Sequence, residues 1–337
     1  MPALERERRR FTAALLGADA APEPDDATER TARGVVVDTT PHLLVVVTPR
    51  GEERFLFEPG TTFWRGREVG VGDLREGDDV VVRCAPGGRW VARDVWAQLA
   101  RVTGVITAAD GDTVEVDPGH GRPRATAVIP YRASGRMSVR HPVLEPGYLF
   151  DAVGIRDGGE VRALLPATTQ PPFPVGEGSR PRPRRDRVPA LTAPWRWWRP
   201  GGAVPGGPVA VSGSVTWYDP ALGRATHVNP LGHLAGAAYP ALDRAGDCGP
   251  ACDRGEACAD LPLLSLGTTV AVRNECNGEA AVVEVVDCAA VATRFCDRCA
   301  ACGGDASGRV AELTLTSFIA LGGRPEAGCF NATLTVG

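Results

Sequence analysis

Three cysteines near the end of the chain have the spacing most suited to chemistry. In the stretch FCDRCAACGG, residues 295–304, Cys296, Cys299 and Cys302 are each separated by two residues. Together with Cys288 they could form a four-thiolate zinc site, because structural zinc is commonly held by closely spaced cysteines. They could instead belong to a disulfide framework, which would place the protein in an oxidising compartment.

The positions of the other cysteines favour the disulfide interpretation. Nine of the ten cysteines follow residue 247, and only Cys84 precedes it. One metal site would use four thiolates and leave the others unexplained, whereas a framework uses nearly all of them. The odd number requires a partner from Cys84 or from another chain. We therefore predict no metal site, no cofactor, and disulfides among Cys248, Cys252, Cys258, Cys276, Cys288, Cys296, Cys299, Cys302 and Cys329.

Two β-rich segments precede the cysteine-rich region. Short strand-like runs such as RGVVVDTT, HLLVVVT and DDVVVRC alternate with Gly, Pro and Asp turns between residues 33 and 99. Residues 100–165 repeat the same order of strands and turns, with a period of about 65 residues. This pattern predicts two small OB-like β-barrels, which serve as spacer or docking modules or bind oligosaccharide or nucleic acid.

The first 32 residues predict a helix followed by a polar tether. Arg8, Arg9 and Phe11 fit a twin-arginine export signal, and Ala18-Asp19-Ala20 fits a cleavage site. A short amphipathic helix is the alternative interpretation. No run of about 18 apolar residues occurs, so we expect no transmembrane segment. The net charge of −4 argues against nucleic acid as a partner.

Residues 166–211 predict an extended linker that is rich in Pro, Arg and Trp. Trp195, Trp197 and Trp198 either pack on a neighbouring domain or form a basic aromatic patch for an anionic polymer or a membrane surface.

The pattern changes again in residues 212–337. The domain opens with SGSVTWYDP, and the runs TTVAVRN and AAVVEVVD flank an Asn277-Gly278 turn. That turn type predicts a β-hairpin. The stretch VAELTLTSFIALGG then predicts a strand that leads into a short helix.

The order of these motifs resembles the double-psi β-barrel family that includes rare lipoprotein A, expansins and barwin-like proteins. The resemblance covers under half of the chain and implies a six-stranded barrel. The fold class expected for the whole chain is therefore mainly β: two small OB-like barrels, the linker, and a cysteine-rich six-stranded double-psi barrel. The matching residues are Val215-Thr216-Trp217-Tyr218, Leu266-Gly267-Thr268-Thr269-Val270, Asn274, Asn277-Gly278, Asp287, Glu312-Leu313-Thr314, Phe318 and Leu321.

Members of this family bind or cut cell-wall polysaccharide in a groove across the barrel, and two carboxylates matter there. The resemblance implies Asp287 and Glu312 as this pair, with Asp297 in the DRC-x-x-C motif as the alternative to Asp287. One acid would protonate a glycosidic oxygen while the other stabilises the positive charge that develops. The glycan-binding residues implied are Thr216, Trp217, Tyr218, Asp287 and Glu312.

The sequence also departs from the lytic members of the family. Leu261 stands where they carry a histidine before the Gly-Thr strand, and Glu312 replaces an aspartate. His227 or His233 could take the place of the missing histidine in space. The departures favour binding over cleavage, and whether the protein is an enzyme stays open.

Three functions follow from this pattern. The first is an extracytoplasmic protein, in the cell envelope or secreted, that binds cell-wall polysaccharide or peptidoglycan without efficient cleavage. The second is a glycan-cleaving enzyme that resembles a lytic transglycosylase and uses Asp287 and Glu312. The third is a structural subunit of an extracellular or phage-like assembly, which would associate with itself or with other envelope proteins.

Overall fold

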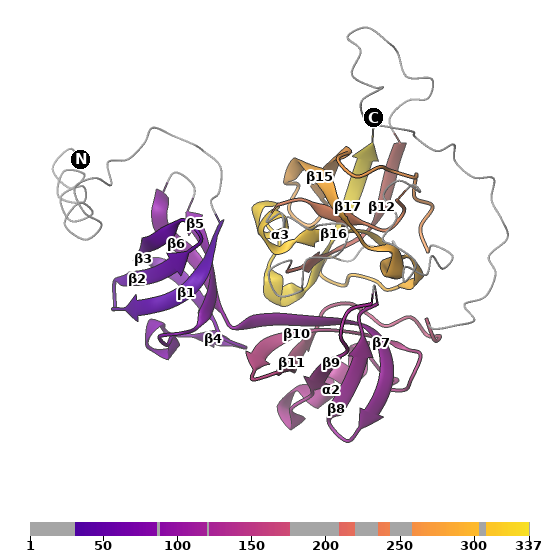
Figure 1. The fold of residues 1–337 in the computed structure, drawn as a ribbon, viewed down its shortest axis with the longest axis horizontal. Coiled ribbons are helices and arrows are strands. Elements are labelled where there is room, and N and C mark those ends of the chain that lie inside the picture. Colours follow the sequence, from indigo (N-terminus) through magenta and orange to yellow (C-terminus); the bar gives the residue numbers. More distant parts are fainter. Residues whose placement is uncertain are drawn as a thin grey trace, which may run out of the picture. The chain divides into compact units, whose positions relative to one another are not determined.

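The computed structural model describes residues 31–85, 88–119, 121–175, 209–219, 235–242, 258–302 and 308–336. Most of the expected N-terminal helix and tether and of the Pro/Arg/Trp linker lies outside these ranges. So do His227, His233, Cys248 and Cys252. The described chain is mainly β and contains three closed barrels, which we number in chain order (Figure 1).

Barrel 1 is a five-stranded barrel in the order β2-β1-β5-β6-β3, closed by pairing of β2 with β3. Strands β3 and β6 run parallel and the other neighbours are antiparallel. Its core is built from inward-facing valines together with Leu44, Phe55 and Cys84. Its elements are β1 (Thr31–Thr39), β2 (Leu43–Thr48), β3 (Gly51–Trp64), β4 (Glu68–Val69), a 3-10 turn at Val71–Asp73, β5 (Asp79–Ala85) and β6 (Gly88–Ala97).

Barrel 2 repeats this architecture. Its five strands close in the order β10-β11-β9-β8-β7, and β9 and β11 are its parallel pair. Counted along the chain, both barrels have the strand order 1-2-3-5-4, which confirms the internal repeat and the expected OB-like topology. Its elements are β7 (Leu99–Asp110), β8 (Thr113–Asp117), β9 (Ala125–Val128), α2 (Tyr131–Arg140), β10 (Leu149–Asp157) and β11 (Glu160–Pro166).

Barrel 3 is six-stranded, as expected, and closes in the order β12-β16-β13-β15-β14-β17. The pairs β12/β16 and β13/β15 are parallel. The hairpin expected at Asn277-Gly278 joins β14 to β15, and Gly278 takes the left-handed backbone (φ +82°) that glycine adopts readily. Its elements are β12 (Val209–Tyr218), β13 (Ala237–Tyr239), β14 (Thr269–Asn274), β15 (Ala280–Cys288), a 3-10 helix at Ala290–Arg294, β16 (Arg309–Thr314), α3 (Leu315–Ala320), a 3-10 turn at Pro325–Ala327 and β17 (Cys329–Val336).

Three disulfides between described residues link the loops and strand ends of barrel 3, and they answer the question raised by FCDRCAACGG. Its three cysteines bond to three different partners, so they do not share a metal ion. The bridges are Cys258–Cys296, Cys276–Cys302 and Cys299–Cys329. Cys288 is disulfide-bonded as well. These bridges indicate an oxidising, extracytoplasmic environment.

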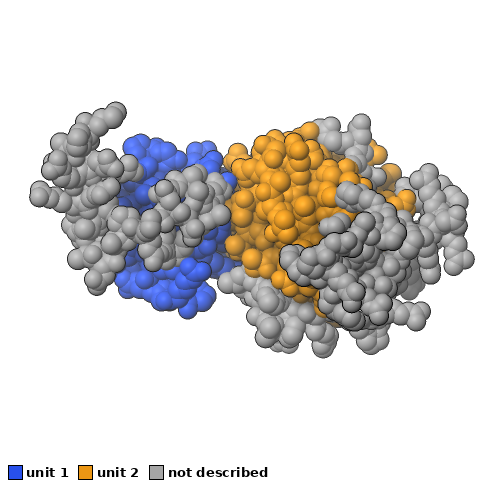
Figure 2. Space-filling view, turned by 90° about the horizontal axis from the view of Figure 1, so that it is seen from above, with its two compact units in different colours: residues 1–98 blue, residues 99–337 orange. Residues whose placement is uncertain are grey.

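The chain forms two compact units, shown in different colours in Figure 2. Residues 1–98 form the first, which holds barrel 1. Residues 99–337 form the second, so barrels 2 and 3 belong to one unit. No helix in the described ranges is long and apolar enough to cross a bilayer.

Candidate functional site

Three of the residues expected to bind glycan lie on one row across barrel 3. Thr216 on β12 is in register with Glu312 on β16, Glu312 with Ala238 on β13, and Ala238 with Asp287 on β15. Residues that are in register on neighbouring strands project to the same face of a sheet. The two carboxylates implied by the resemblance therefore share a face and are separated by the width of one strand.

Barrel 2 covers this row. Ala238, at its centre, belongs to a buried apolar cluster that includes Leu149 of β10 and Val175, which follows barrel 2 in the chain. Val291 and Phe295 from the 3-10 region of barrel 3 complete the contact. On the row itself Thr216 and Asp287 are buried, and only 15% of the Glu312 side chain is exposed.

Arg309 is the hub of a polar network on the same face. The register between β12 and β16 shifts after Ser214, which opposes Arg309, whereas the next residue, Val215, opposes Ala311. This bulge places Arg309 on the same side of β16 as Glu312, although three positions separate them. The Arg309 side chain is completely buried, and its guanidinium carbon lies 4.8 Å from the centre of the Phe295 ring.

The Arg309 guanidinium donates to acceptors from both barrels. Nε donates to Asp297 Oδ2 (3.0 Å) and Nη1 to Glu312 Oε1 (2.5 Å). Nη2 donates to Asp151 Oδ2 on β10 (2.7 Å) and to Thr103 Oγ1 on β7 (3.1 Å). One buried cation thus joins two carboxylates of barrel 3 to one carboxylate of barrel 2.

A second arginine completes the network from the side of barrel 2. Arg101 donates from Nε to Asp151 Oδ1 (2.8 Å) and from Nη2 to Asp151 Oδ2 (2.7 Å), which is the forked geometry that guanidinium and carboxylate favour. Its Nη1 donates to the main-chain oxygen of Trp217 in barrel 3. Thr168 Oγ1 donates to Asp151 Oδ2 (3.0 Å). We call Arg101, Asp151, Asp297, Arg309 and Glu312 the Arg309 network.

The carboxylates of the network differ in acidity. Burial alone would raise the pKa of Asp151, but Arg101 and Arg309 outweigh it and hold that pKa below its usual range. Burial raises the pKa of Asp297, and a single arginine, Arg309, offsets only part of this effect. The charges explain the difference, because two guanidinium groups face three carboxylates, so one carboxylate is in excess.

His141 lies against the network. It is fully buried, and its Nδ1 lies 3.3 Å from the main-chain oxygen of Leu149. Burial lowers its pKa, even though the neighbouring Asp151 acts in the opposite direction. His141 is therefore a buried residue that packs beside the network, against the Phe150 ring.

The remaining residues implied by the resemblance take structural positions. Trp217 is fully buried, and its Nε1 donates to the main-chain oxygen of Pro325 (2.9 Å). Tyr218 is half-buried and packs against the apolar cluster that barrels 2 and 3 form together. Asp287 Oδ1 accepts from the main-chain nitrogen of Cys288 (2.7 Å). Asp297, rather than Asp287, is the acid that shares Arg309 with Glu312.

This geometry restricts what the carboxylates can do chemically. A general acid must reach the glycosidic oxygen directly or through one water molecule. Burial raises the pKa of Asp297, but its carboxyl is completely buried, and Glu312 is paired with a buried guanidinium. The arrangement is that of a structural network that joins two barrels.

Sequence reasoning missed Arg101, Asp151 and Arg309. A signal was present, because Asp151 interrupts the apolar run LFDAVG and Arg309 opens the buried strand RVAELT. A charged residue within a buried strand almost always has a charged partner. No protein-family model matches this sequence, and no curated protein matches it.

Proposed function

We propose that the protein works in the cell envelope or as a secreted protein, and that it binds cell-wall polysaccharide or peptidoglycan without cleaving it efficiently. The three disulfides support the location, because such frameworks persist outside the reducing cytoplasm. The resemblance of barrel 3 to the double-psi β-barrel family supports the ligand class.

The position of Arg309 is the observation that supports the absence of cleavage. It pairs with Glu312 and Asp297 in a buried space that barrel 2 covers. Releasing either acid for catalysis would leave a buried guanidinium partly unpaired, which costs several kcal/mol, roughly 3 to 5 for a complete break. Glu312 therefore supports the attachment of barrel 2 through Arg309, and we expect glycan to contact other surfaces.

The test is incubation of the oxidised, full-length protein with purified cell wall. We expect the protein to sediment with the wall and to release no soluble sugar fragments. Glu312→Gln is the matched control, since it keeps the shape of the side chain. We expect it to be retained as well as the wild type, provided that circular dichroism confirms its fold.

Two results would contradict the proposal. Fragments released by the wild type and lost in Glu312→Gln would establish the glycan-cleaving alternative. Wild-type protein that stays in the supernatant would show that wall polysaccharide is not the ligand.

A structural subunit of an extracellular assembly is the second candidate. The observation that favours it is the burial of the side chains expected to bind glycan: Thr216, Trp217 and Asp287 are at most 2% exposed. The two candidates differ in native mass, because a subunit forms large oligomers in the absence of any glycan.

A further inference from the structure

Helix α2 of barrel 2 carries a stripe of arginines. Arg132, Arg136 and Arg140 recur every four residues, so they lie along one side of the helix. The helix contains no acidic residue. Arg132 and Arg136 are exposed, and their side chains make no ion pair or hydrogen bond within the described part of the chain. The whole chain has a net charge of −4, so the positive charge of α2 is a local feature of the surface.

The helix is held rigidly in place. Ala133 and Met137 are buried in the core of barrel 2, so the opposite side of α2 is fixed to the barrel. The other outward residues are Tyr131, which is 95% exposed, and Val139, which is 76% exposed, together with small and hydroxyl residues. The stripe is therefore a preformed surface, and a ligand would not have to order it.

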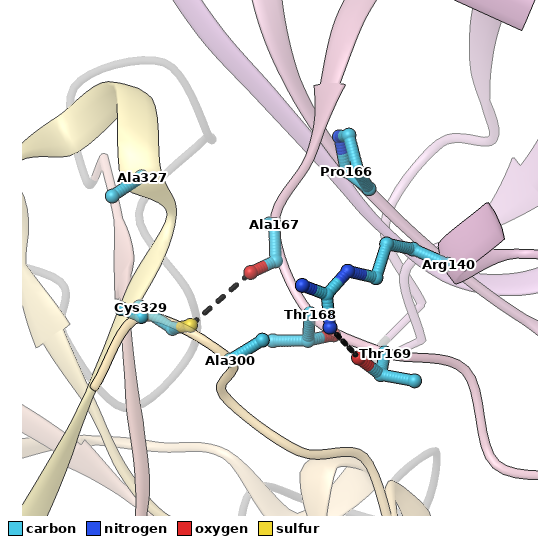
Figure 3. A pocket seen from close by; sticks show the side chains of 9 residues that line it. Arg140, Pro166, Ala167, Thr168, Thr169, Ala300, Ala327 and Cys329 are labelled. Carbon is cyan, nitrogen blue, oxygen red and sulfur yellow. Dashed lines mark hydrogen bonds between the residues drawn. The ribbon is translucent and has the colours of Figure 1, made fainter. Parts of the chain in front are cut away.

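The stripe ends at a pocket of about 170 Å³ between barrels 2 and 3. Figure 3 shows Arg140 at its edge, with its Nη1 donating to Thr169 Oγ1 (2.9 Å). Thr168 and Thr169 add polar atoms to the lining. The remaining lining residues are small or apolar: Pro166, Ala167, Ala300, Ala301, Ala327 and Cys329.

A fourth arginine lies beside this pocket, from barrel 3. Arg298 forms an isolated β-bridge with Thr169, in which each main-chain nitrogen donates to the other residue's oxygen. Its neighbours Asp297 and Cys299 are buried, while Arg298 itself is exposed. Arginines from both barrels thus lie close to one small cavity.

We propose that the stripe and the pocket bind an acidic polysaccharide, one that carries carboxylates or phosphates along its chain. Arg132 and Arg140 are about 12 Å apart along the helix axis, so a polymer with repeated charges can contact successive arginines. The forked guanidinium donors match carboxylate and phosphate oxygens. The pocket has room for a single substituent next to Arg140. The inference rests on the proposed function and specifies its ligand as anionic.

The composition of α2 distinguishes a polymer from a lipid surface. A helix that lies in a membrane interface buries a broad apolar face among the lipids. The apolar residues Ala133 and Met137 already pack inside barrel 2. On the exposed side, Tyr131 and Val139 are separated by Ser134, Gly135 and Ser138, which offer no apolar surface to insert.

The test measures binding of the oxidised, full-length protein to polygalacturonate, with neutral dextran and phosphatidylglycerol vesicles as comparisons. The variant is Arg132→Gln with Arg136→Gln. The control is Arg50→Gln with Arg67→Gln, which removes two exposed arginines of barrel 1. We expect the α2 variant to bind polygalacturonate roughly tenfold more weakly. The control should differ from the wild type by less than about twofold.

Three results would overturn the inference: equal weakening in both double variants, equal binding of dextran, or vesicle binding that depends on Arg132 and Arg136. The same measurements separate a failure of the acidic-polysaccharide inference from a failure of the proposed wall binding. Wild-type protein that sediments with the wall but binds no polygalacturonate refutes only the acidic ligand. Protein that neither sediments nor binds any polymer refutes both.

Discussion

Reduction of the disulfides is expected to unfold barrel 3 and to leave barrel 1 folded. The bridges Cys258–Cys296, Cys276–Cys302 and Cys299–Cys329 span 38, 26 and 30 residues. Loop-closure entropy then gives about 3.5 to 4 kcal/mol for each bridge, and roughly 11 kcal/mol together. That sum is comparable to the whole free energy of unfolding of an ordinary domain, about 5 to 15 kcal/mol.

Hydrogen exchange read by mass spectrometry measures this effect region by region. After reduction and alkylation, we expect the amides of β12 and β14–β17 to lose protection. The amides of barrel 1 serve as an internal control, because its core contains Cys84 but none of the three bridges. Unchanged protection in barrel 3 after complete alkylation would mean that its apolar core is sufficient on its own.

The second large effect is expected from Arg309→Met. The substitution leaves Asp151, Asp297 and Glu312 close together and buried, with Arg101 as the only guanidinium remaining in the network. Removal of one partner from a buried ion pair costs about 3 to 5 kcal/mol. We expect a loss of this size in the free energy of unfolding of residues 99–337, measured by denaturant titration.

Arg324→Gln is the matched control for this substitution. Arg324 also lies in barrel 3 and pairs with Glu326, but 75% of its side chain is exposed. An exposed pair contributes about 1 kcal/mol or less, so this variant should unfold nearly like the wild type. If Arg309→Met cost no more than Arg324→Gln, the network would not hold barrels 2 and 3 together.

The barrels were predictable from the sequence because their signals are local. Alternating burial along a strand appears directly in runs such as TVEVD of β8 and TVAVRN of β14. The Asn277-Gly278 pair is a strong local signal for a hairpin, and the strands on either side of it pair as β14 and β15. The repeat of strands and turns indicated two barrels of the same topology, without any knowledge of how the strands pair.

The Arg309 network was not predictable in the same way, because its partners are distant in sequence. Asp151 and Arg309 are 158 positions apart and belong to different barrels. The register bulge that turns Arg309 toward Glu312 has no signature in the strand RVAELT. A resemblance confined to residues 212–337 also carries no information on barrel 2. The carboxylates were therefore expected in a groove across the barrel, whereas Glu312 lies in the Arg309 network against barrel 2.

For the cysteines, the sequence predicted that a disulfide framework exists but did not predict which cysteines pair. Their density and number indicated a framework, which the three bridges confirm. The pairing depends on which loops meet in space. Cys299 bonds to Cys329 at the start of β17, and Cys302 bonds to Cys276 in the hairpin between β14 and β15. Spacing alone does not distinguish these partners from the many other possible ones.

Carboxyl footprinting tests most directly whether barrel 2 buries Asp297 and Glu312 of barrel 3. Native protein is labelled with a carbodiimide and an amine, and each site is read by mass spectrometry. We predict that Asp151 and Asp297 stay unlabelled until the protein is unfolded and that Glu312 reacts slowly, while the exposed Glu160 and Glu279 react at once. Labelling of Asp297 and Glu312 as fast as Glu279 would contradict the claim, because the row would then be open to solvent and to a glycan.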